Sequence, residues 1–344
     1  MAYTTINKST DNFNTKIYTG NNSSQTITGI GFQPDWVWFK SRTTTDSHYL
    51  VDSVRGNTKY LRSQTNTAEE TNTTAVTSFN SDGYALGSAG NVNDNANYVA
   101  WNWLANGAGS SNTDGSITSN VSANTTAGFS IVSYTGNGTS GATVGHGLGS
   151  VPKVVIVKTK SGTGNWINYH SSLGNTKYLS LNQTNSAGTT SQAWNDTSPT
   201  NQVFSLGNSS EVNGNGTTMI AYCFAEKKGY SKFGSYTGNG STDGTFVYTG
   251  FKPAWLMVKR TTVTGENWYI YDNTRPTFFN PNKSILIANQ NLAEYNNFGD
   301  IDFLSNGFKI RTTNNSANDS GETYVYIAFG QSLVGSNNVP CTAR

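Results

Sequence analysis

The chain has 344 residues, and its composition excludes several classes of protein before any motif is considered. It carries 22 Lys and Arg against 20 Asp and Glu, a formal net charge of +2, and charged residues make up only 12% of the sequence, about half of the usual share. A net charge so close to zero supplies no sustained field for nucleic acid or for an anionic membrane surface. Aromatic residues make up 12%, which argues against disorder because disordered chains are poor in them. We therefore expect a folded protein that does not bind nucleic acid.

The two cysteines and the first residues of the chain give further expectations. Cys223 lies in an apolar run and Cys341 among the last residues, so they suit neither a disulfide framework nor a paired-cysteine metal motif. The residues after Met1 lack a basic segment followed by an apolar one, which predicts no secretory signal. No stretch approaches the roughly 18 consecutive apolar residues of a membrane span, so we expect no membrane insertion.

Three copies of one sequence pattern follow one another along the chain. The motif Tyr-Thr-Gly-Asn begins at Tyr18, Tyr134 and Tyr236. A block that reads Gly-Asn-Thr-Lys-Tyr-Leu occurs unchanged at 56–61 and 174–179. Since internal self-similarity decides the architecture, we expect three tandem copies of one domain.

Each copy contains two segments that predict β-strands. The first is a short apolar run just after a proline, rich in β-branched and aromatic residues, which is typical of a strand buried on both faces. The second is an aromatic strand that closes the copy. The apolar runs are Trp36–Lys40, Val154–Lys158 and Trp255–Lys259, and the closing strands are Tyr98–Trp103, Met219–Phe224 and Tyr324–Phe329. Turn-forming clusters of Gly, Asn and Asp separate the strands, and no segment sustains a helical period.

These patterns predict an all-β protein of three tandem homologous β-sandwich domains, jelly-roll-like, of about 100 residues each. The segment 107–128 is rich in Gly, Ser, Asn and Thr and has no apolar periodicity, so it predicts a flexible linker. The predicted boundaries are residues 1–106 for repeat 1, 107–128 for the linker, 129–228 for repeat 2, 229–334 for repeat 3 and 335–344 for a C-terminal tail.

A search for catalytic chemistry finds no complete motif. The histidines His48, His146 and His170 lie in different settings and in no metal-binding pattern. The glycine-rich segments 136–138 and 238–240 lack the Lys and the following helix of a phosphate loop, and we interpret them as turns. We therefore expect neither a metal nor a cofactor.

A glycosidase would need a pair of carboxylates, and candidates for such a pair do not recur between the copies. Asp52, His170 and Asp272 hold matching places, so the side chain changes its charge from copy to copy. This pattern suits a scaffold better than a duplicated active site, and we expect no enzyme. The alternative is a single active copy that uses one of the close acidic pairs, which are Glu69 with Glu70 and Asp300 with Asp302.

Aromatic side chains suggest a binding function, because Trp and Tyr rings stack on sugars. Trp166 and Trp268 recur at matching places, and Tyr49 lies at the corresponding place in copy one, so these three are the candidate glycan contacts. The favoured interpretation is nevertheless that they face the core. Core positions are also expected for Trp36, Trp101, Trp103, Phe224, Trp255 and Phe329. The lysines that end the apolar runs are expected to cap the solvent ends of buried strands, namely Lys40, Lys158 and Lys259.

The repeated motifs resemble those of tandem β-domain virion proteins of tailed bacteriophages, particularly marine ones. The resemblance covers most of the chain and concerns scaffold motifs, so it implies no functional residues. It implies a structural or adhesive role on a virus particle, in a tail fibre, a spike or a capsid-bound appendage. The motifs that carry it are the Tyr-Thr-Gly-Asn opening, the Gly-Phe-x-Pro-x-Trp strand, the Gly-Asn-Thr-Lys-Tyr-Leu block, the Phe79–Tyr84 turn, the Ala100–Trp103 strand and the ending Val339–Arg344.

This resemblance leads us to expect a non-enzymatic tail-fibre or appendage protein with host-surface glycan adhesion, assembled in the host cytoplasm into the virion. Its expected partners are other virion proteins and a host glycan, in a homo-oligomeric assembly. The alternatives are a capsid-decoration or head-fibre protein, a free carbohydrate-binding protein and a glycan-degrading spike. Three copies in one chain would also imitate a trimer, an idea that an extended row of copies would contradict.

Overall fold

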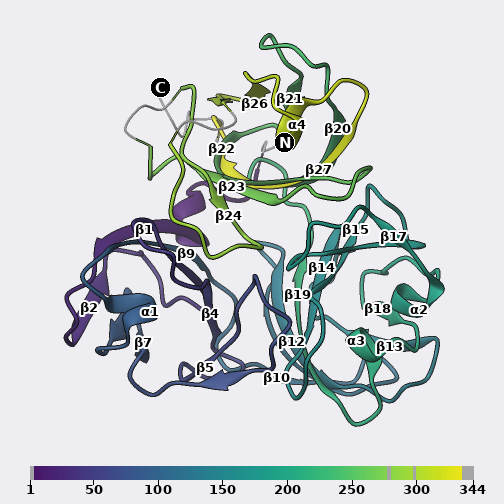
Figure 1. Ribbon diagram of the computed structural model, residues 1–344. Helices are drawn as coiled ribbons and strands as arrows, with labels where there is room; N and C mark the ends of the chain where they lie inside the picture. Colours follow the sequence, from purple (N-terminus) through teal and green to yellow (C-terminus); the bar gives the residue numbers. More distant parts are fainter. Residues whose placement is uncertain (1–3, 277–279, 297–299, 335–344) are drawn as a thin grey trace.

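The computed structural model describes residues 4–276, 280–296 and 300–334, and antiparallel β-sheets dominate it (Figure 1). The all-β class predicted from the sequence is confirmed at this level. Figure 1 shows three lobes around a common centre, with repeat 1 in purple and blue, repeat 2 in teal and repeat 3 in green and yellow. The predicted C-terminal tail, residues 335–344, and Cys341 lie outside the described residues.

Repeat 1 contains a main sheet with the strand order β1-β9-β3-β4 and a small sheet with the order β2-β8-β7. The main sheet consists of β1 (Phe13–Thr19), β3 (Trp36–Ser41), β4 (Tyr49–Asp52) and β9 (Asn97–Trp103). The small sheet consists of β2 (Gln25–Thr28), β7 (Val76–Asn80) and β8 (Gly83–Leu86). The remaining elements are η1 (Ser9–Asp11), the paired strands β5 (Lys59–Tyr60) and β6 (Glu70–Thr71), and α1 (Gly90–Asn93).

Repeat 2 belongs to an eight-stranded main sheet with the order β10-β11-β12-β19-β14-β15-β16-β17, and its small sheet pairs β13 with β18. The main sheet consists of β10 (Ser110–Asn112), β11 (Ser119–Asn124), β12 (Phe129–Thr135), β14 (Val154–Thr159), β15 (Ile167–His170), β16 (Lys177–Ser180), β17 (Gly188–Thr189) and β19 (Thr218–Phe224). The other elements are β13 (Ala142–Gly145), α2 (Ser191–Trp194), β18 (Val203–Leu206) and α3 (Ser210–Asn213).

Repeat 3 has a main sheet with the order β20-β27-β22-β23-β24 and a small sheet with the order β21-β26-β25. The main sheet consists of β20 (Ser231–Thr237), β22 (Lys252–Arg260), β23 (Trp268–Asp272), β24 (Leu286–Ile287) and β27 (Thr323–Gln331). The other elements are β21 (Phe246–Tyr248), β25 (Ile301–Leu304), β26 (Gly307–Ile310) and α4 (Asn315–Asn318).

One strand order therefore recurs in the three repeats. In each main sheet the closing strand (β9, β19 or β27) lies between the opening strand and the strand that carries the apolar run (β3, β14 or β22). Residues that occupy the same place in these pairings are equivalent between the repeats. The prediction that the apolar runs form strands buried on both faces is confirmed, because every residue of β3 and of β14 is buried.

The two faces of each main sheet pack against different hydrophobic clusters. In β3, Val37 and Phe39 face a peripheral cluster shared with the small sheet of repeat 1, whereas Trp36 and Trp38 face the centre of the molecule. Because successive side chains of a strand point to opposite faces, each main sheet contributes to both clusters. Repeats 2 and 3 have peripheral clusters of their own.

The central cluster is built by all three repeats together. The side chains predicted to be core residues all lie in it and are at most 2% exposed, namely Trp36, Trp101, Trp103, Phe224, Trp255 and Phe329. The rings cross the repeat boundaries, with 4.4 Å between the centroids of Trp36 and Tyr222 and 5.7 Å between those of Phe224 and Phe329. The repeats thus share a core in addition to their peripheral ones, and they surround it instead of forming an extended row (Figure 1).

The segment 107–128 is not the flexible linker that the sequence predicts. Its strand β11 pairs along its length with β12, and β10 pairs with β11, so both extend the main sheet of repeat 2. Ser and Asn make up most of these strands, and the hydrogen bonds of the backbone do not depend on the side chains. The composition therefore resembles that of a linker although the backbone is hydrogen-bonded.

The Tyr-Thr-Gly-Asn motif holds the short helix that precedes each closing strand. In repeat 2 the hydroxyl of Tyr134 donates to the carbonyl of Val212 in α3 at 2.7 Å, and the backbone N–H of Asn137 donates to Oδ1 of the buried Asn213 at 2.9 Å. A Cβ on Gly136 would lie 2.5 Å from a backbone oxygen, so the close approach requires glycine. We call this arrangement the clasp.

The clasp recurs with the same atoms in the other two repeats. Tyr18 and Tyr236 donate to carbonyls of α1 and α4, and the buried Asn93 and Asn318 accept from backbone N–H groups of their motifs. The motif therefore serves the scaffold, and the glycine-rich segments that follow it are loops without a helix behind them. Over the described residues, no helix has the length and apolar character needed to cross a membrane.

Candidate functional site

The three residues proposed as glycan contacts are buried, so that assignment is wrong. Tyr49 and Trp166 are 0% exposed and Trp268 is 2% exposed, which leaves no ring face for a sugar to stack on. The favoured alternative, that these rings face the core, agrees with the structure. The pairing register also shows that His48 and not Tyr49 is equivalent to Trp166, because Tyr49 pairs with Phe39 as Ile167 pairs with Val157.

These equivalent side chains bind the neighbouring repeat. We call the contact between repeats 1 and 2 the first seam and the contact between repeats 2 and 3 the second seam. The contact between repeats 3 and 1 is the third seam. At each seam one ring N–H donates to a backbone carbonyl of the adjacent repeat, and the three carbonyls are themselves equivalent. The bonds run from Trp166 to Arg62 at 3.0 Å, from Trp268 to Ser180 at 3.0 Å and from His48 to Ile287 at 2.9 Å.

Backbone hydrogen bonds repeat the same cycle. At each seam an N–H donates to the carbonyl of a residue just after the buried strand of the next repeat. The bonds run from Glu69 to Lys160 at 2.9 Å, from Ala187 to Thr261 at 2.8 Å and from Glu294 to Arg42 at 2.8 Å. Because the third seam joins repeat 3 back to repeat 1, the three repeats form a closed ring within one chain.

A buried ion triad lies at the first seam. Arg55 donates through Nε to Oδ2 of Asp52 at 2.5 Å, and its Nη1 lies 3.3 Å from Oε2 of Glu69. The hydroxyl of Tyr222 in repeat 2 donates to the same Oδ2 of Asp52 at 2.7 Å. The side chains of Asp52 and Arg55 are at most 1% exposed, so the charges are screened little by solvent.

The third seam carries the equivalent triad, and the second seam replaces it. Asp272, Arg275 and Glu294 form the same pairs, and the indole N–H of Trp101 donates to Asp272 at 2.9 Å. In repeat 2 the equivalent residues are His170, Leu173 and Ala187, and His170 hydrogen-bonds the carbonyl of Tyr326 at 3.2 Å. All three charges are replaced together, which avoids an unpaired buried ion. The difference in charge among Asp52, His170 and Asp272 is therefore explained by the partners that each residue has at its seam.

The acidic pairs proposed for a single active copy are held by basic side chains that differ for each member. Glu69 lies beside Arg55, and Glu70 contacts Arg62 and the hydroxyl of Tyr60. Asp302 lies 2.6 Å from Nε of Arg311, and Asp300 lies 3.5 Å from Lys283. Among the residues that the structure describes, the two carboxylates of neither pair share a basic partner.

The lysines at the ends of the apolar runs do not lie at solvent ends as predicted. Lys40, Lys158 and Lys259 are 0% exposed, and their ammonium groups donate to backbone carbonyls. Lys158 donates to the carbonyl of Thr159 at 2.8 Å, and Lys40 donates to that of Ser41 at 2.8 Å. Burial lowers the pKa of each of the three lysines to about 8, because desolvation disfavours the charged form.

The three histidines share a neutral form with both ring nitrogens engaged. In His48, His146 and His170, Nδ1 accepts an N–H and Nε2 donates to a backbone carbonyl. Burial lowers the pKa of His48 to about 3 and that of His170 to about 4. Burial also raises the pKa of the Cys223 thiol. In residues 4–276, 280–296 and 300–334, no three His, Cys, Asp or Glu side chains gather as a metal site would require.

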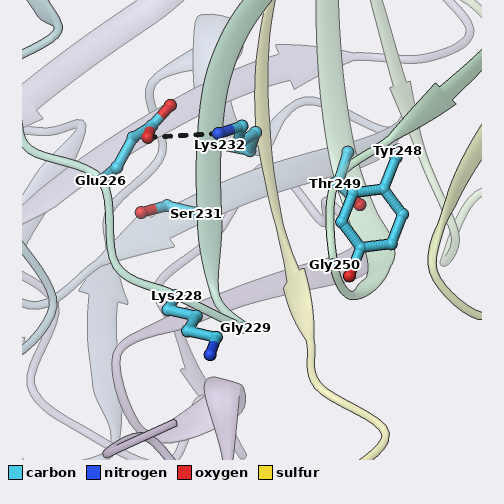
Figure 2. Close-up of a pocket in the computed structure, with 8 residues that line it drawn as sticks. All are labelled: Glu226, Lys228, Gly229, Ser231, Lys232, Tyr248, Thr249 and Gly250. Atoms are coloured by element: carbon cyan, nitrogen blue, oxygen red, sulfur yellow. Dashed lines mark hydrogen bonds and ion pairs between the residues drawn. The ribbon is translucent and has the colours of Figure 1, made fainter. Parts of the chain in front are cut away.

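A cleft of about 510 Å³ opens where the join of repeats 2 and 3 meets the small sheet of repeat 3. Figure 2 shows Lys228 and the Glu226–Lys232 ion pair on one side and Tyr248 on the other. Nζ of Lys232 lies 3.4 Å from Oε2 of Glu226. Ser231, Thr249 and two glycines complete the lining.

An exposed aromatic pair beside this cleft was missed at the level of the sequence. Phe246 is 44% exposed and Tyr248 is 59% exposed, both on β21. The residues equivalent to them in β2 of repeat 1 are the exposed Thr26 and Thr28. An alignment of the small-sheet strands could have found the pair, because repeat 3 alone has aromatic residues at these two positions.

Comparison with known proteins gives a family but no characterised relative. No curated protein and no solved structure matches the chain. One family model matches residues 8–332, a span that covers all three repeats except the first seven and the last two residues of their range, and that includes all three seams. The chain therefore belongs to the family described as Domain of unknown function (DUF7483).

Proposed function

We propose that this chain is a non-enzymatic structural protein of a tailed-bacteriophage virion, exposed as a component of a tail fibre, spike or similar appendage. We further propose that its three repeats are homologous β-sandwiches of jelly-roll-like type. Other virion proteins are the proposed partners, in a homo-oligomeric assembly, and the proposed location is the virion.

The closed ring of repeats is the observation that carries this proposal. A single chain whose seams repeat the same contacts is a covalent equivalent of a trimer, and closed cyclic assemblies satisfy all their interfaces. Such a body suits a three-fold or six-fold position on a particle. It also leaves exposed residues of β2 and β21, in the small sheets of repeats 1 and 3, available for contacts with neighbours.

The burial of the charged groups, the aromatic rings and the Cys223 thiol supports a structural role. The charged groups at the first and third seams pair with each other inside the protein, and the repeated aromatic rings fill the shared core. Cys223 is a buried free thiol, which suits assembly in a reducing cytoplasm. These residues therefore stabilise the body of the protein.

Immunogold electron microscopy of purified phage particles, with an antibody raised against this chain, tests the proposal. Gold at the tail or its fibres is the expected result, and an antibody against the major capsid protein of the same particles is the control. Label spread over the shell would contradict the assignment to an appendage and support a capsid-decoration protein. Absence of label, with absence of its peptides from the particle proteome, would overturn the virion assignment in favour of a free carbohydrate-binding protein.

A further inference from the structure

We propose that a pocket beside β23 and β24 of repeat 3 binds a tyrosine side chain that a neighbouring virion protein presents. The pocket has a volume of about 250 Å³. Ile285 and Ile287 line it and are at most 7% exposed, and Tyr295 borders it and is 45% exposed. The remaining lining residues are Asn267, Tyr269, Gln290 and Leu292. This inference deepens the proposed function and rests on it, because it names the chemistry by which one virion partner is held.

The pairing registers of repeats 1 and 3 place Ile285 where repeat 1 has Tyr60. In repeat 3 Tyr295 pairs with Ile285. In repeat 1 Glu70 pairs with Tyr60, so Tyr295 is equivalent to Glu70. Repeat 2 also has a tyrosine at the first of these positions, Tyr178 of the second Gly-Asn-Thr-Lys-Tyr-Leu block. Repeat 3 is therefore the one repeat in which an isoleucine takes the place of this ring.

In repeat 1 the ring of Tyr60 fills the space that corresponds to the pocket. Its centroid lies 4.1 Å from that of the Tyr49 ring and 5.1 Å from the guanidinium carbon of Arg62. Its hydroxyl donates to Oε2 of Glu70 at 2.6 Å. The residues equivalent to these three neighbours all line the pocket of repeat 3, namely Tyr269, Ile287 and Tyr295. A phenol ring is thus the group that the scaffold places at this position.

The lining suits one ring with a polar substituent. Ile285, Ile287 and Leu292 offer apolar contacts, and an apolar cavity of about 150 Å³ is already large enough to bind benzene. Nε2 of Gln290 donates to Oδ1 of Asn267 at 3.0 Å, which fixes this amide and leaves its Oε1 to accept from a phenol hydroxyl. Tyr269 is engaged in interactions of its own, so it serves as a wall and none of its groups is assigned to the ligand.

The size and place of the pocket favour a protein side chain as the source of the ring. A volume of about 250 Å³ lies below the roughly 300–1,000 Å³ of sites that enclose a free small molecule. β24 is the last strand in the order of its main sheet, so the pocket lies at a sheet edge that a neighbouring protein can approach. Tyrosine is enriched among the residues that carry the binding energy of protein interfaces.

Saturation-transfer difference NMR of the full chain with p-cresol and N-acetyl-tyrosinamide tests the pocket. The first probe is the tyrosine side chain alone, and the second carries the same ring on a peptide backbone. We expect both to bind with a dissociation constant on the order of 1 mM, since few atoms make contact, and N-acetyl-alaninamide not to bind. No binding of either phenol, or equal binding of N-acetyl-alaninamide, would overturn the pocket. Binding of p-cresol alone would indicate a site for a free phenol and overturn the docking of a side chain.

The variants use residues that the scaffold already accepts. Ile285→Tyr introduces the side chain of Tyr60, so we expect the thermal midpoint to be retained while binding of both phenols is lost, because the new ring fills the pocket. Tyr295→Glu introduces the side chain of Glu70 at the exposed border and is expected to weaken binding about tenfold. Phe246→Glu, at an aromatic residue that is 44% exposed outside the pocket, is the matched control. Unchanged binding in either pocket variant, or an equal loss in the control, would contradict the site.

Immunogold labelling of assembled particles separates this inference from the proposed function. Particles whose chain carries Ile285→Tyr are expected to bind about tenfold less gold than those with Phe246→Glu, because an anchor residue carries much of the binding energy. Equal label on the two would overturn the tyrosine anchor and retain the structural role. Absence of label from unmodified particles would overturn the proposed function, whereas phenol binding that Ile285→Tyr abolishes would still identify the pocket. Self-association of the purified chain that Ile285→Tyr abolishes would overturn the neighbouring protein in favour of a second copy.

Discussion

The buried asparagine of each clasp is the residue on which the Tyr-Thr-Gly-Asn motif depends. Nδ2 of Asn213 donates to the carbonyls of Thr139 and Gly207 at 2.9 and 2.8 Å, and its Oδ1 accepts from Asn137. Its side-chain bonds with Asn137 and Thr139 join segments that are distant in sequence. The asparagine therefore connects the opening strand of a repeat to the helix before its closing strand.

We expect Asn213→Ala to lower the free energy of unfolding by about 2–3 kcal/mol, because three backbone groups in one buried and two partly buried hydrogen bonds lose their partner. Urea denaturation followed by tryptophan fluorescence measures the change. Asn185→Ala, at an exposed asparagine whose amide contacts only Gln183, is the control and should change stability by less than about 0.5 kcal/mol. A loss at Asn213 no larger than this would mean that the clasp is not required for stability.

The three buried lysines predict a stability that rises with pH. Burial lowers the pKa of Lys40, Lys158 and Lys259 to about 8 from an ordinary value of 10.5. Above pH 8 the unfolded chain therefore binds more protons than the folded one, and the free energy of unfolding increases with pH by up to about 1.4 kcal/mol per pH unit for each lysine.

Urea denaturation between pH 7.5 and 9 checks this direction, at pH values below the ordinary tyrosine pKa of 10.0. The thiol of Cys223, whose pKa is raised by burial from an ordinary value of 9.0, opposes the trend over this range, but as one group against three lysines. Lys158→Met should remove about a third of the slope, whereas Lys177→Met, at an exposed lysine, should leave it unchanged. A stability that is flat or falls over this range would show that the three ammonium groups are not desolvated as the structure indicates.

The sequence predicted the burial of the aromatic residues but not which repeats they join. Trp36 and Trp255 stand in apolar runs, and a hydrophobic run gives burial directly. Trp166 binds a carbonyl of repeat 1 only because the repeats close into a ring, and no local pattern encodes that arrangement. The exposed Phe246 and Tyr248 escaped notice because single exposed aromatics have no local signature without the comparison to Thr26 and Thr28.

At the scale of elements, the ion triads behave as units that are exchanged whole. Repeat 2 carries His170, Leu173 and Ala187 where repeat 1 carries Asp52, Arg55 and Glu69. A buried charge without its partner is costly, whereas a full replacement by neutral groups is tolerated. Natural variation among the repeats follows this rule.

The triad therefore makes a prediction about the first seam. Arg55→Leu alone should destabilise the protein by about 3–5 kcal/mol, because it leaves Asp52 buried and unpaired. The triple variant Asp52→His, Arg55→Leu, Glu69→Ala transfers the set of repeat 2 and should be more stable than Arg55→Leu. Thermal denaturation of both proteins gives the order, and a triple variant weaker than the single one would contradict the exchange of the triad as a unit.

Because β10 and β11 are paired strands, we expect slow amide hydrogen exchange in a segment whose composition is typical of a linker. Their amides pair with neighbouring strands, so hydrogen exchange monitored by mass spectrometry should be slow in residues 119–124 and comparable to that of β12. The loop 161–163, which lies outside the strands, is the internal reference for fast exchange. Fast exchange throughout 107–128 would instead support the flexible linker that the sequence predicts.

The sequence did not predict β10 and β11 as strands because both are rich in Ser and Asn. Apolar periodicity reports the side-chain face that a strand buries, and β10 buries none of its residues. The apolar runs of β3, β14 and β22 were found because both of their faces are covered. Sequence patterns thus revealed the elements that make the cores and missed those that only extend a sheet.

At the scale of the whole molecule, the shared central cluster couples the three repeats. We expect a single calorimetric unfolding transition, with a van't Hoff enthalpy equal to the calorimetric one, because separating any repeat would expose rings of the central cluster. Residues 229–334 expressed alone should not fold to a monomer. Three resolved transitions in the full chain, or a folded isolated repeat, would contradict this coupling.

The closed ring has a consequence for valency. A homotrimer built from one repeat would display any change three times, since its subunits have one sequence. In this chain each lobe has diverged separately, and the Phe246–Tyr248 pair occurs in repeat 3 alone. One chain therefore presents a single copy of that surface, and any avidity must come from the number of chains on a particle.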